Sequence, residues 1–259
     1  MTDDQRKGPR TLDEVYALID TNRIDAAGAA QAKFHHDIET AIATIANIGS
    51  VAGARVLADS RVASAKVLIN AELAATRLLA DAEMQASKCV NQVLIKPREV
   101  VEAAILEVGK LATWRLTATA RESVEAIHQD AEFAINALKE TGAHAIREIQ
   151  ALAAKVDTQT KHDAEQAAAK LKQFRERPRT MDEATSEGHD AAQIVIKAAR
   201  HVSVGLQTAV KVSIAEINSV TEAACSAVHD AAVAAEEKII EGRERALLRL
   251  RETLQAHLG

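Results

Sequence analysis

Glu125 and His128 form a Glu-x-x-His motif, in which a carboxylate and an imidazole lie about one helical turn apart. That spacing lets both side chains bind one metal ion, and di-iron bundles combine two such motifs with two further inward carboxylates. This chain holds no second Glu-x-x-His. We therefore interpret the pair as a surface contact, and a metal-binding bundle is the least favoured of three functional hypotheses.

The other residues that could carry chemistry are scattered along the chain. His35 and His36 are adjacent, so on a helix they point to different faces and do not form one ligand set. Cys89 and Cys225 lie far apart, a spacing typical of free buried thiols in a reducing compartment. No glycine-rich phosphate loop or nucleophile elbow occurs. The sequence therefore predicts a cytoplasmic protein that is not an enzyme, with no catalytic, cofactor-binding or metal-ligating residues.

The charge pattern argues against nucleic acid as a partner. The formal net charge is -5, and acidic and basic residues alternate along the whole chain instead of gathering into basic clusters. Aromatic residues make up 2% of the sequence, which leaves few platforms on which bases could stack. We expect the partners to be a second copy of the chain or other helical proteins, with a membrane or lipid surface as the second class.

Three prolines divide the 259-residue chain into similar segments. Pro9, Pro97 and Pro178 are each followed by Arg, and the seven residues from Pro9 closely resemble those from Pro178. Thr11 with Glu14, and Thr180 with Glu183, fit the capping box of a helix start. We therefore expect a polar lead at 1–10 and three helical repeats at 11–96, 97–177 and 178–259, separated by helix breaks at Pro97 and Pro178.

Softer interruptions follow the first and third of these helix starts. They lie at 20–22 (Asp-Thr-Asn) and 186–188 (Ser-Glu-Gly). Because Gly, Asn and Ser favour turns, each site could separate a short helix from the long helix that follows. For the first repeat, 11–96, we expect a short helix followed by a long one.

Apolar residues recur at every eleventh position in all three repeats. The columns include Phe34, Ile45, Val56, Val67, Leu78 and Cys89 in the first repeat, Ile105, Leu116, Ile127, Leu138 and Ile149 in the second, and Val195, Leu206, Ile217, Val228, Ile239 and Leu250 in the third. Eleven residues in three turns give 3.67 residues per turn, a period that favours a right-handed supercoil. We expect these columns to form the core seam.

Two further columns keep the same period. Small residues at 109, 120, 131, 142, 153 and 164 would let a neighbouring backbone approach closely, and we predict close packing at Gly109, Ala120, Ala131, Gly142 and Ala153. Basic residues at 55, 66, 77 and 88 precede the apolar column of the first repeat by one position. We expect that basic column to face solvent.

These patterns predict an all-α protein of very long helices, with few glycines and prolines to interrupt them. Apolar residues beside the main seam, such as Ile196 and Val210, indicate that each helix contacts two others. Short turns at the prolines favour an antiparallel up-down-up three-helix rod. The alternative keeps the prolines as kinks in one extended path, whose core would then come from self-association.

The last segment, 243–251, is rich in Arg and Leu. Arginines near a helix C-terminus complement the helix dipole while the leucines extend the core, but a basic amphipathic helix can also lie on an anionic bilayer. The leading functional hypothesis is a non-catalytic structural or scaffolding coiled coil of the cytoplasm that acts as a rigid rod, a spacer or an oligomeric interaction platform. The second is an amphipathic-helix protein that binds a membrane, lipid or granule surface.

Overall fold

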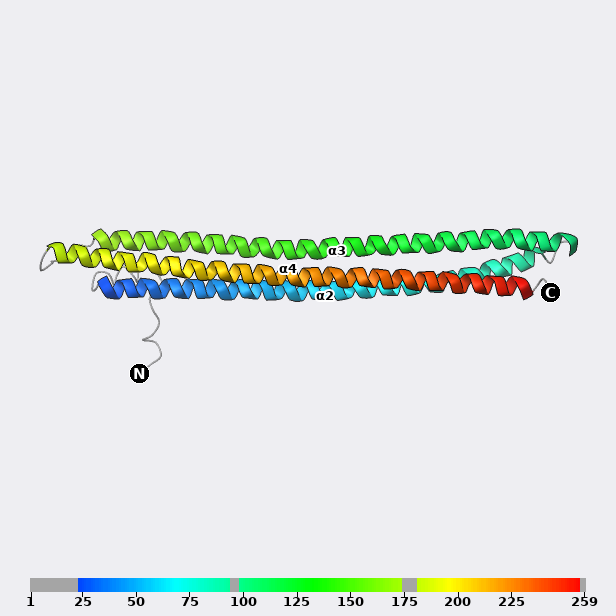
Figure 1. Cartoon of the computed structure of the whole chain (residues 1–259), viewed down its shortest axis with the longest axis horizontal. Helices are drawn as coiled ribbons and strands as arrows, with labels where there is room; N and C mark the ends of the chain where they lie inside the picture. Colours follow the sequence, from blue (N-terminus) through cyan, green and yellow to red (C-terminus); the bar gives the residue numbers. More distant parts are fainter. Residues whose placement is uncertain (1–22, 94–97, 174–180, 257–259) are drawn as a thin grey trace, which may run out of the picture. The chain divides into compact units, whose positions relative to one another are not determined.

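The computed structural model describes residues 23–93, 98–173 and 181–256, and every one of these residues is α-helical. Helix α2 spans Arg23–Val93, α3 spans Arg98–Gln173 and α4 spans Met181–Ala256 (Figure 1). The prediction of an all-α protein built from three long helices is therefore confirmed. Pro97, Pro178, the capping threonines and the expected short first helix lie outside the described residues.

The predicted interruption at 186–188 is wrong, because α4 continues through these positions from Met181. One mid-helix glycine costs only about 1 kcal/mol relative to alanine. That cost is small beside the packing of a helix of 76 residues, which shares a core with two others.

Helices α2 and α4 run in the same direction. In the middle of α2 the Ser60 hydroxyl donates a hydrogen bond to the carbonyl of Ala224, 2.9 Å away. Further along, the Glu83 carboxylate lies 3.9 Å from the Arg249 guanidinium. Because the residue numbers in contact rise together, the two helices are parallel.

Helix α3 runs against the other two. Its contacts with α4 pair His128 with Glu236 and the Ile135 carbonyl with Cys225, so the residue numbers change in opposite directions. Figure 1 shows the same reversal between α2 and α3. The up-down-up arrangement is therefore confirmed, and the alternative of one extended path with kinks is wrong.

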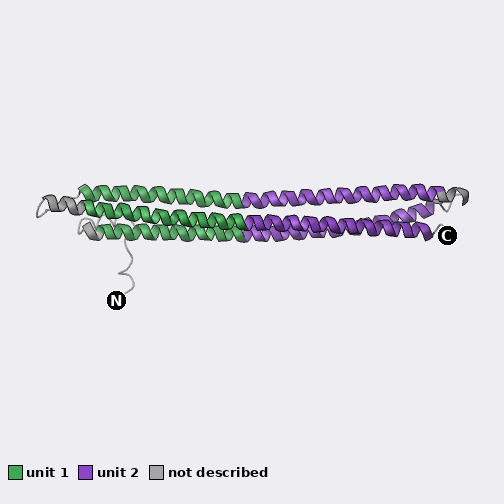
Figure 2. Ribbon diagram, viewed as in Figure 1, with its two compact units in different colours: residues 1–53, 142–219 green, residues 54–141, 220–259 purple. Residues whose placement is uncertain are grey.

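The chain divides into two compact units, and each helix contributes one segment to each unit (Figure 2). Unit 1 comprises residues 1–53 and 142–219, and unit 2 comprises residues 54–141 and 220–259. Each unit is a three-helix bundle around its own apolar core. The sequence segments 11–96, 97–177 and 178–259 each supply one of the three helices and do not form separate domains.

All thirteen predicted seam residues are buried, and none is more than 3% exposed. Those in unit 1 are Ile149, Val195, Leu206 and Ile217. Those in unit 2 are Val56, Val67, Leu78, Leu116, Ile127, Leu138, Val228, Ile239 and Leu250. The eleven-residue column of each helix therefore faces the two neighbouring helices, while the right-handed supercoil stays a prediction.

The column of small residues lies along the inner side of α3. Ala120, Ala131 and Gly142 are buried, whereas Gly109 and Ala153 are half-buried. A Cβ atom placed on Gly109 would lie 3.1 Å from Leu254 Cδ1 of α4, so the two helices approach closely there.

Two glycines of α4 provide a test of this close packing, since alanine should have opposite effects at the two positions. Gly205→Ala adds a Cβ with nothing within 4 Å, and it should stabilise the fold by about 0.5–1 kcal/mol through helix propensity. Gly242→Ala places a Cβ 2.7 Å from Ala75 Cβ and 3.0 Å from its Cα. Overpacking against this backbone should cost about 1–3 kcal/mol. Urea unfolding of both variants measures the difference, and a gain in stability at Gly242 would contradict this packing.

Candidate functional site

The Glu-x-x-His residues are held by separate partners. Glu125 accepts a hydrogen bond from the Arg121 guanidinium at 3.1 Å on the same helix. His128 Nε2 lies 3.0 Å from Glu236 Oε2 of α4. Among the described residues, no group of three or more His, Cys, Asp or Glu side chains is placed to hold a metal ion.

The two cysteines remain free thiols. Cys89 is buried in the core of unit 2, and the half-buried Cys225 packs against that core. Desolvation by the surrounding protein raises the pKa of both thiols, which disfavours the nucleophilic thiolate at neutral pH.

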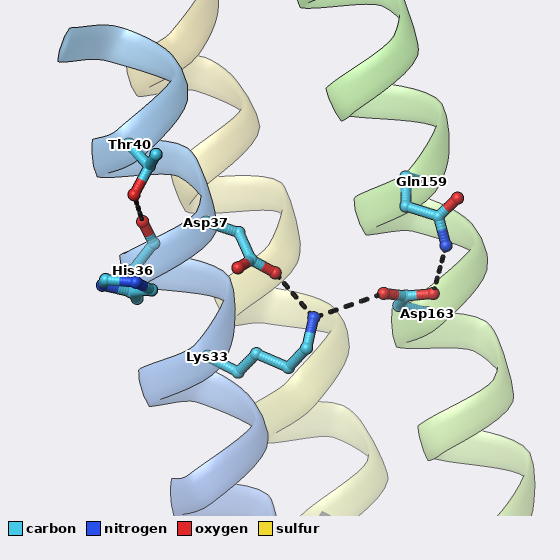
Figure 3. Close-up of polar contacts among 6 residues, drawn as sticks. All are labelled: Lys33, His36, Asp37, Thr40, Gln159 and Asp163. Carbon is cyan, nitrogen blue, oxygen red and sulfur yellow. Dashed lines mark hydrogen bonds and ion pairs between the residues drawn. The ribbon is translucent and has the colours of Figure 1, made fainter. Parts of the chain in front are cut away.

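A buried ion pair joins α2 to α3 in unit 1 (Figure 3). The Lys33 ammonium lies 3.6 Å from an oxygen of Asp163 and donates a hydrogen bond of 2.6 Å to Asp37, one turn along α2. The Gln159 amide donates to the other Asp163 oxygen at 2.7 Å. Lys33 is 9% exposed and Asp163 is 4% exposed, so both charges are largely withdrawn from water. A contact of this kind holds the two helices in one register.

A second polar contact in unit 1 joins α3 to α4. The Asp157 carboxylate accepts hydrogen bonds from Lys161 and from the Ser203 hydroxyl of α4. These two hydrogen bonds, and the positive charge of Lys161, hold the pKa of Asp157 below its ordinary value. The contact again sets the alignment of two helices and creates no group with unusual reactivity.

The main candidate for an interaction site is an exposed apolar stripe on the α2 segment of unit 2, which we call the α2 stripe. Val62, Ile69, Leu73 and Met84 are 69%, 55%, 51% and 45% exposed. The exposed Ala58 and Ala80 complete it, so that its residues are 58, 62, 69, 73, 80 and 84. The spacing alternates between four and seven residues, which lines them up on one face at 3.67 residues per turn. The α2 stripe thus repeats the pattern of the core seam on the side facing away from the core.

Charged residues lie along one edge only of the α2 stripe. The edge carries the predicted basic column, Arg55, Lys66, Arg77 and Lys88, and all four side chains are exposed. Lys66 lies 3.5 Å from Asp130 of α3, and Arg55 lies 3.8 Å from Asp59. The other edge carries the small uncharged residues 65, 76 and 87. The α2 stripe is therefore apolar along its length and positively charged along one edge.

The α2 stripe was not identified from the sequence, although the sequence contains a periodic apolar pattern that corresponds to it. Reading every eleventh residue from Val62 gives Leu73 and Met84, an apolar column like that of Val67 and Leu78. Two apolar columns on one helix indicate two contacted faces, but only the structure identifies which of them the other two helices cover.

The basic C-terminal segment, 243–251, packs against the bundle through two of its leucines and forms ion pairs through most of its arginines. Leu250 is buried and Leu247 is half-buried, while Leu248 is exposed. Arg249 faces Glu83 of α2, and Arg245 lies 3.6 Å from Glu241 one turn earlier. Arg245 and Arg249 therefore have carboxylate partners, as do Arg55 and Lys66 of the basic column.

Comparison with known proteins supports the three-helix fold but assigns the chain to no family. No family model matches the chain, and no curated protein does. A computationally designed three-helix bundle aligns with 95% of this chain and 97% of its own length, with a TM-score of 0.51 at 12% sequence identity. That likeness extends to the architecture alone.

Proposed function

We propose that this protein is a non-catalytic structural protein, a helical bundle that associates with a second copy of itself through the α2 stripe. The observation that carries the proposal is the exposure of this continuous apolar line on a helix whose opposite face is fully packed. Contiguous apolar surface on a folded protein marks an interaction site. The structural role would then consist in connecting copies of the bundle.

The spacing of the α2 stripe favours a helix as the partner. A partner that matches alternating intervals of four and seven residues over 58–84 must itself repeat every eleven residues. Every copy of this chain supplies helices with this period. A second α2 stripe meets the requirement, since two-fold symmetry makes the same surface face itself.

The basic column favours a parallel pair of α2 helices. In an antiparallel pair, each edge of the α2 stripe faces the same edge of its copy, so the column containing Lys66 and Arg77 would oppose itself. In a parallel pair the basic edge faces the opposite edge, which carries Ala65, Thr76 and Ser87. Avoiding rows of like charge therefore selects the parallel arrangement.

Measurement of the mass in solution tests the proposal. At about 100 µM the protein should have twice the 27.7 kDa mass of one chain by light scattering after size exclusion. The double variant Val62→Glu/Leu73→Glu should be a monomer, because it places four carboxylates in the paired α2 stripe. Both positions are exposed, so its melting temperature should stay close to that of the wild type.

A matched control makes the same change elsewhere. Val204→Glu/Val212→Glu also replaces two exposed apolar residues, on α4 in unit 1, and should leave the dimer intact. A wild-type protein that is monomeric at this concentration would refute self-association. Loss of the dimer in both double variants would show that the contact is not specific to the α2 stripe.

The second candidate is a protein that binds an anionic membrane surface. Two observations favour it: the basic column beside the α2 stripe, and a window of α2 with a mean hydropathy of 1.5, apolar and long enough to span a membrane by composition alone. A helix that packs in a soluble bundle passes the same test. Flotation with anionic and neutral vesicles distinguishes the candidates, since the α2 dimer should stay at the bottom and a membrane-surface protein should float with anionic vesicles.

A further inference from the structure

A groove of about 620 Å³ lies between α3 and α4 in unit 2, away from the α2 stripe. Its walls are formed by the segments 105–117 and 250–255. The volume falls within the range of roughly 300–1,000 Å³ that is typical of small-molecule sites. No role of the bundle described above uses this groove.

The absence of a side chain at Gly109 opens the groove. Gly109 stands between Ile105 and Thr113 on the wall of α3 and faces Leu254 of α4. Leu106 and Trp114 line the groove beside it, and both are largely exposed, at 62% and 67%. Two large apolar side chains at a hollow in the surface would gain most by contact with an apolar ligand.

The threonines of the groove add little polarity. Thr113 Oγ1 donates a hydrogen bond to the Gly109 carbonyl at 2.9 Å, and Thr117 Oγ1 donates to the Thr113 carbonyl at 2.9 Å. Their hydroxyl protons are therefore engaged by the backbone of α3. The two threonines accordingly add no free hydroxyl proton to the groove.

The charges of the groove have one sign. Lys110 and Arg251 are its charged residues, one from each wall, and no carboxylate lines it. Neither side chain forms an ion pair with another of the described residues. Two cations beside an apolar hollow are complementary to a ligand that has an anionic head and an apolar tail.

We propose that this groove binds a single-chain anionic amphiphile, such as a fatty acid. The tail lies along Leu106, Trp114 and Leu254, and the carboxylate lies between Lys110 and Arg251. This proposal does not depend on dimerisation through the α2 stripe, since no residue of the α2 stripe lines the groove.

Trp114 is the only tryptophan in the chain and serves as the reporter. Titration of the full-length protein with dodecanoate, below its micellar concentration, should shift the Trp114 emission to shorter wavelength and reach saturation. Dodecyltrimethylammonium has the same tail and the opposite charge, and it should bind at least about tenfold more weakly. Equal affinity for the two probes would overturn the assignment of an anionic ligand.

Two variants test the residues named. Lys110→Gln/Arg251→Gln should weaken dodecanoate binding about tenfold, whereas Lys139→Gln/Arg245→Gln removes the same charge from the same helices outside the groove and should leave it unchanged. Gly109→Leu should abolish the shift by filling the groove. A Cβ at this position would lie 3.1 Å from Leu254 Cδ1, so the flexible end of Leu254 must shift. Helical circular dichroism checks that Gly109→Leu stays folded, and the Lys110→Gln/Arg251→Gln variant tests the groove without this change in packing.

The remaining outcomes also decide the proposal. Equal weakening in the groove and control double variants would show nonspecific attraction by positive charge and overturn the site. A Trp114 shift with phosphatidylglycerol vesicles but not with dodecanoate would assign the groove to a membrane surface, and the proposal of a free amphiphile would be wrong. The dimer measured by light scattering should be unaffected by all of these variants, so the two proposals fail independently.

Discussion

Leu138→Asp should lower the melting temperature by about 10 °C or more, and Ile217→Asp should have a comparable effect. Leu138 is 2% exposed in the core of unit 2, and Ile217 is 1% exposed in that of unit 1. Truncation of a buried leucine or isoleucine alone costs about 2–5 kcal/mol. The aspartate adds the cost of a carboxylate without a partner in an apolar core, so the total should exceed about 4 kcal/mol. For a chain of this size, each kcal/mol corresponds to roughly 2–4 °C.

The matched control introduces the same residue five positions earlier on α3. Phe133 is 78% exposed, and Phe133→Asp should change the free energy of unfolding by no more than about 0.5 kcal/mol. Thermal unfolding followed by circular dichroism measures all three variants. A melting temperature for Leu138→Asp that matches that of Phe133→Asp would show that the eleven-residue column does not face the core.

Lys33→Met should destabilise the protein by about 3–5 kcal/mol, because it leaves the 4%-exposed Asp163 carboxylate without its cation. The methionine retains most of the volume of the lysine side chain, so the loss comes from the charge and not from a cavity. The double variant Lys33→Met/Asp163→Leu removes both charges. Its loss should be smaller than that of Lys33→Met, since replacing a whole buried ion pair by apolar residues is often neutral.

An exposed ion pair of equal length is the control. Lys161 lies 2.6 Å from Asp157, the same distance that separates Lys33 from Asp37, but the Lys161 side chain is 63% exposed. Lys161→Met should therefore cost only about 0.2–1 kcal/mol. Urea denaturation of the wild type and of these three variants measures the free energies of unfolding to be compared. Equal losses for Lys33→Met and Lys161→Met would show that the Lys33 pair is solvated.

Much of the fold could be predicted because apolar residues recur at one regular interval along the chain. Val195, Leu206 and Ile217 recur at the period of a helix, and so do their counterparts on the other two helices. A pattern of this kind specifies which face of a helix is buried whatever its neighbours are. The three widely spaced prolines limited the number of long helices to three, and short connections between them required antiparallel neighbours.

The candidate sites could not be predicted in the same way. Glu125 and His128 had the spacing of a metal site, yet each contacts a different partner. Lys33 belongs to no eleven-residue apolar column, and its partner Asp163 is 130 positions away in the sequence. The groove residues Lys110 and Arg251 come from two helices, and only their packing brings them to one hollow.

The sequence by itself determined the class of the protein, the length of its helices and the buried column of each, because helical periodicity is a local property that repeats along the chain. Tertiary structure decided which surfaces remain open. Val67 and Val62 are identical residues in two apolar columns of α2, yet Val67 is 2% exposed and Val62 is 69% exposed. The reason is geometric: two neighbouring helices can cover only part of the circumference of a third, and their positions depend on contacts between residues far apart in the chain.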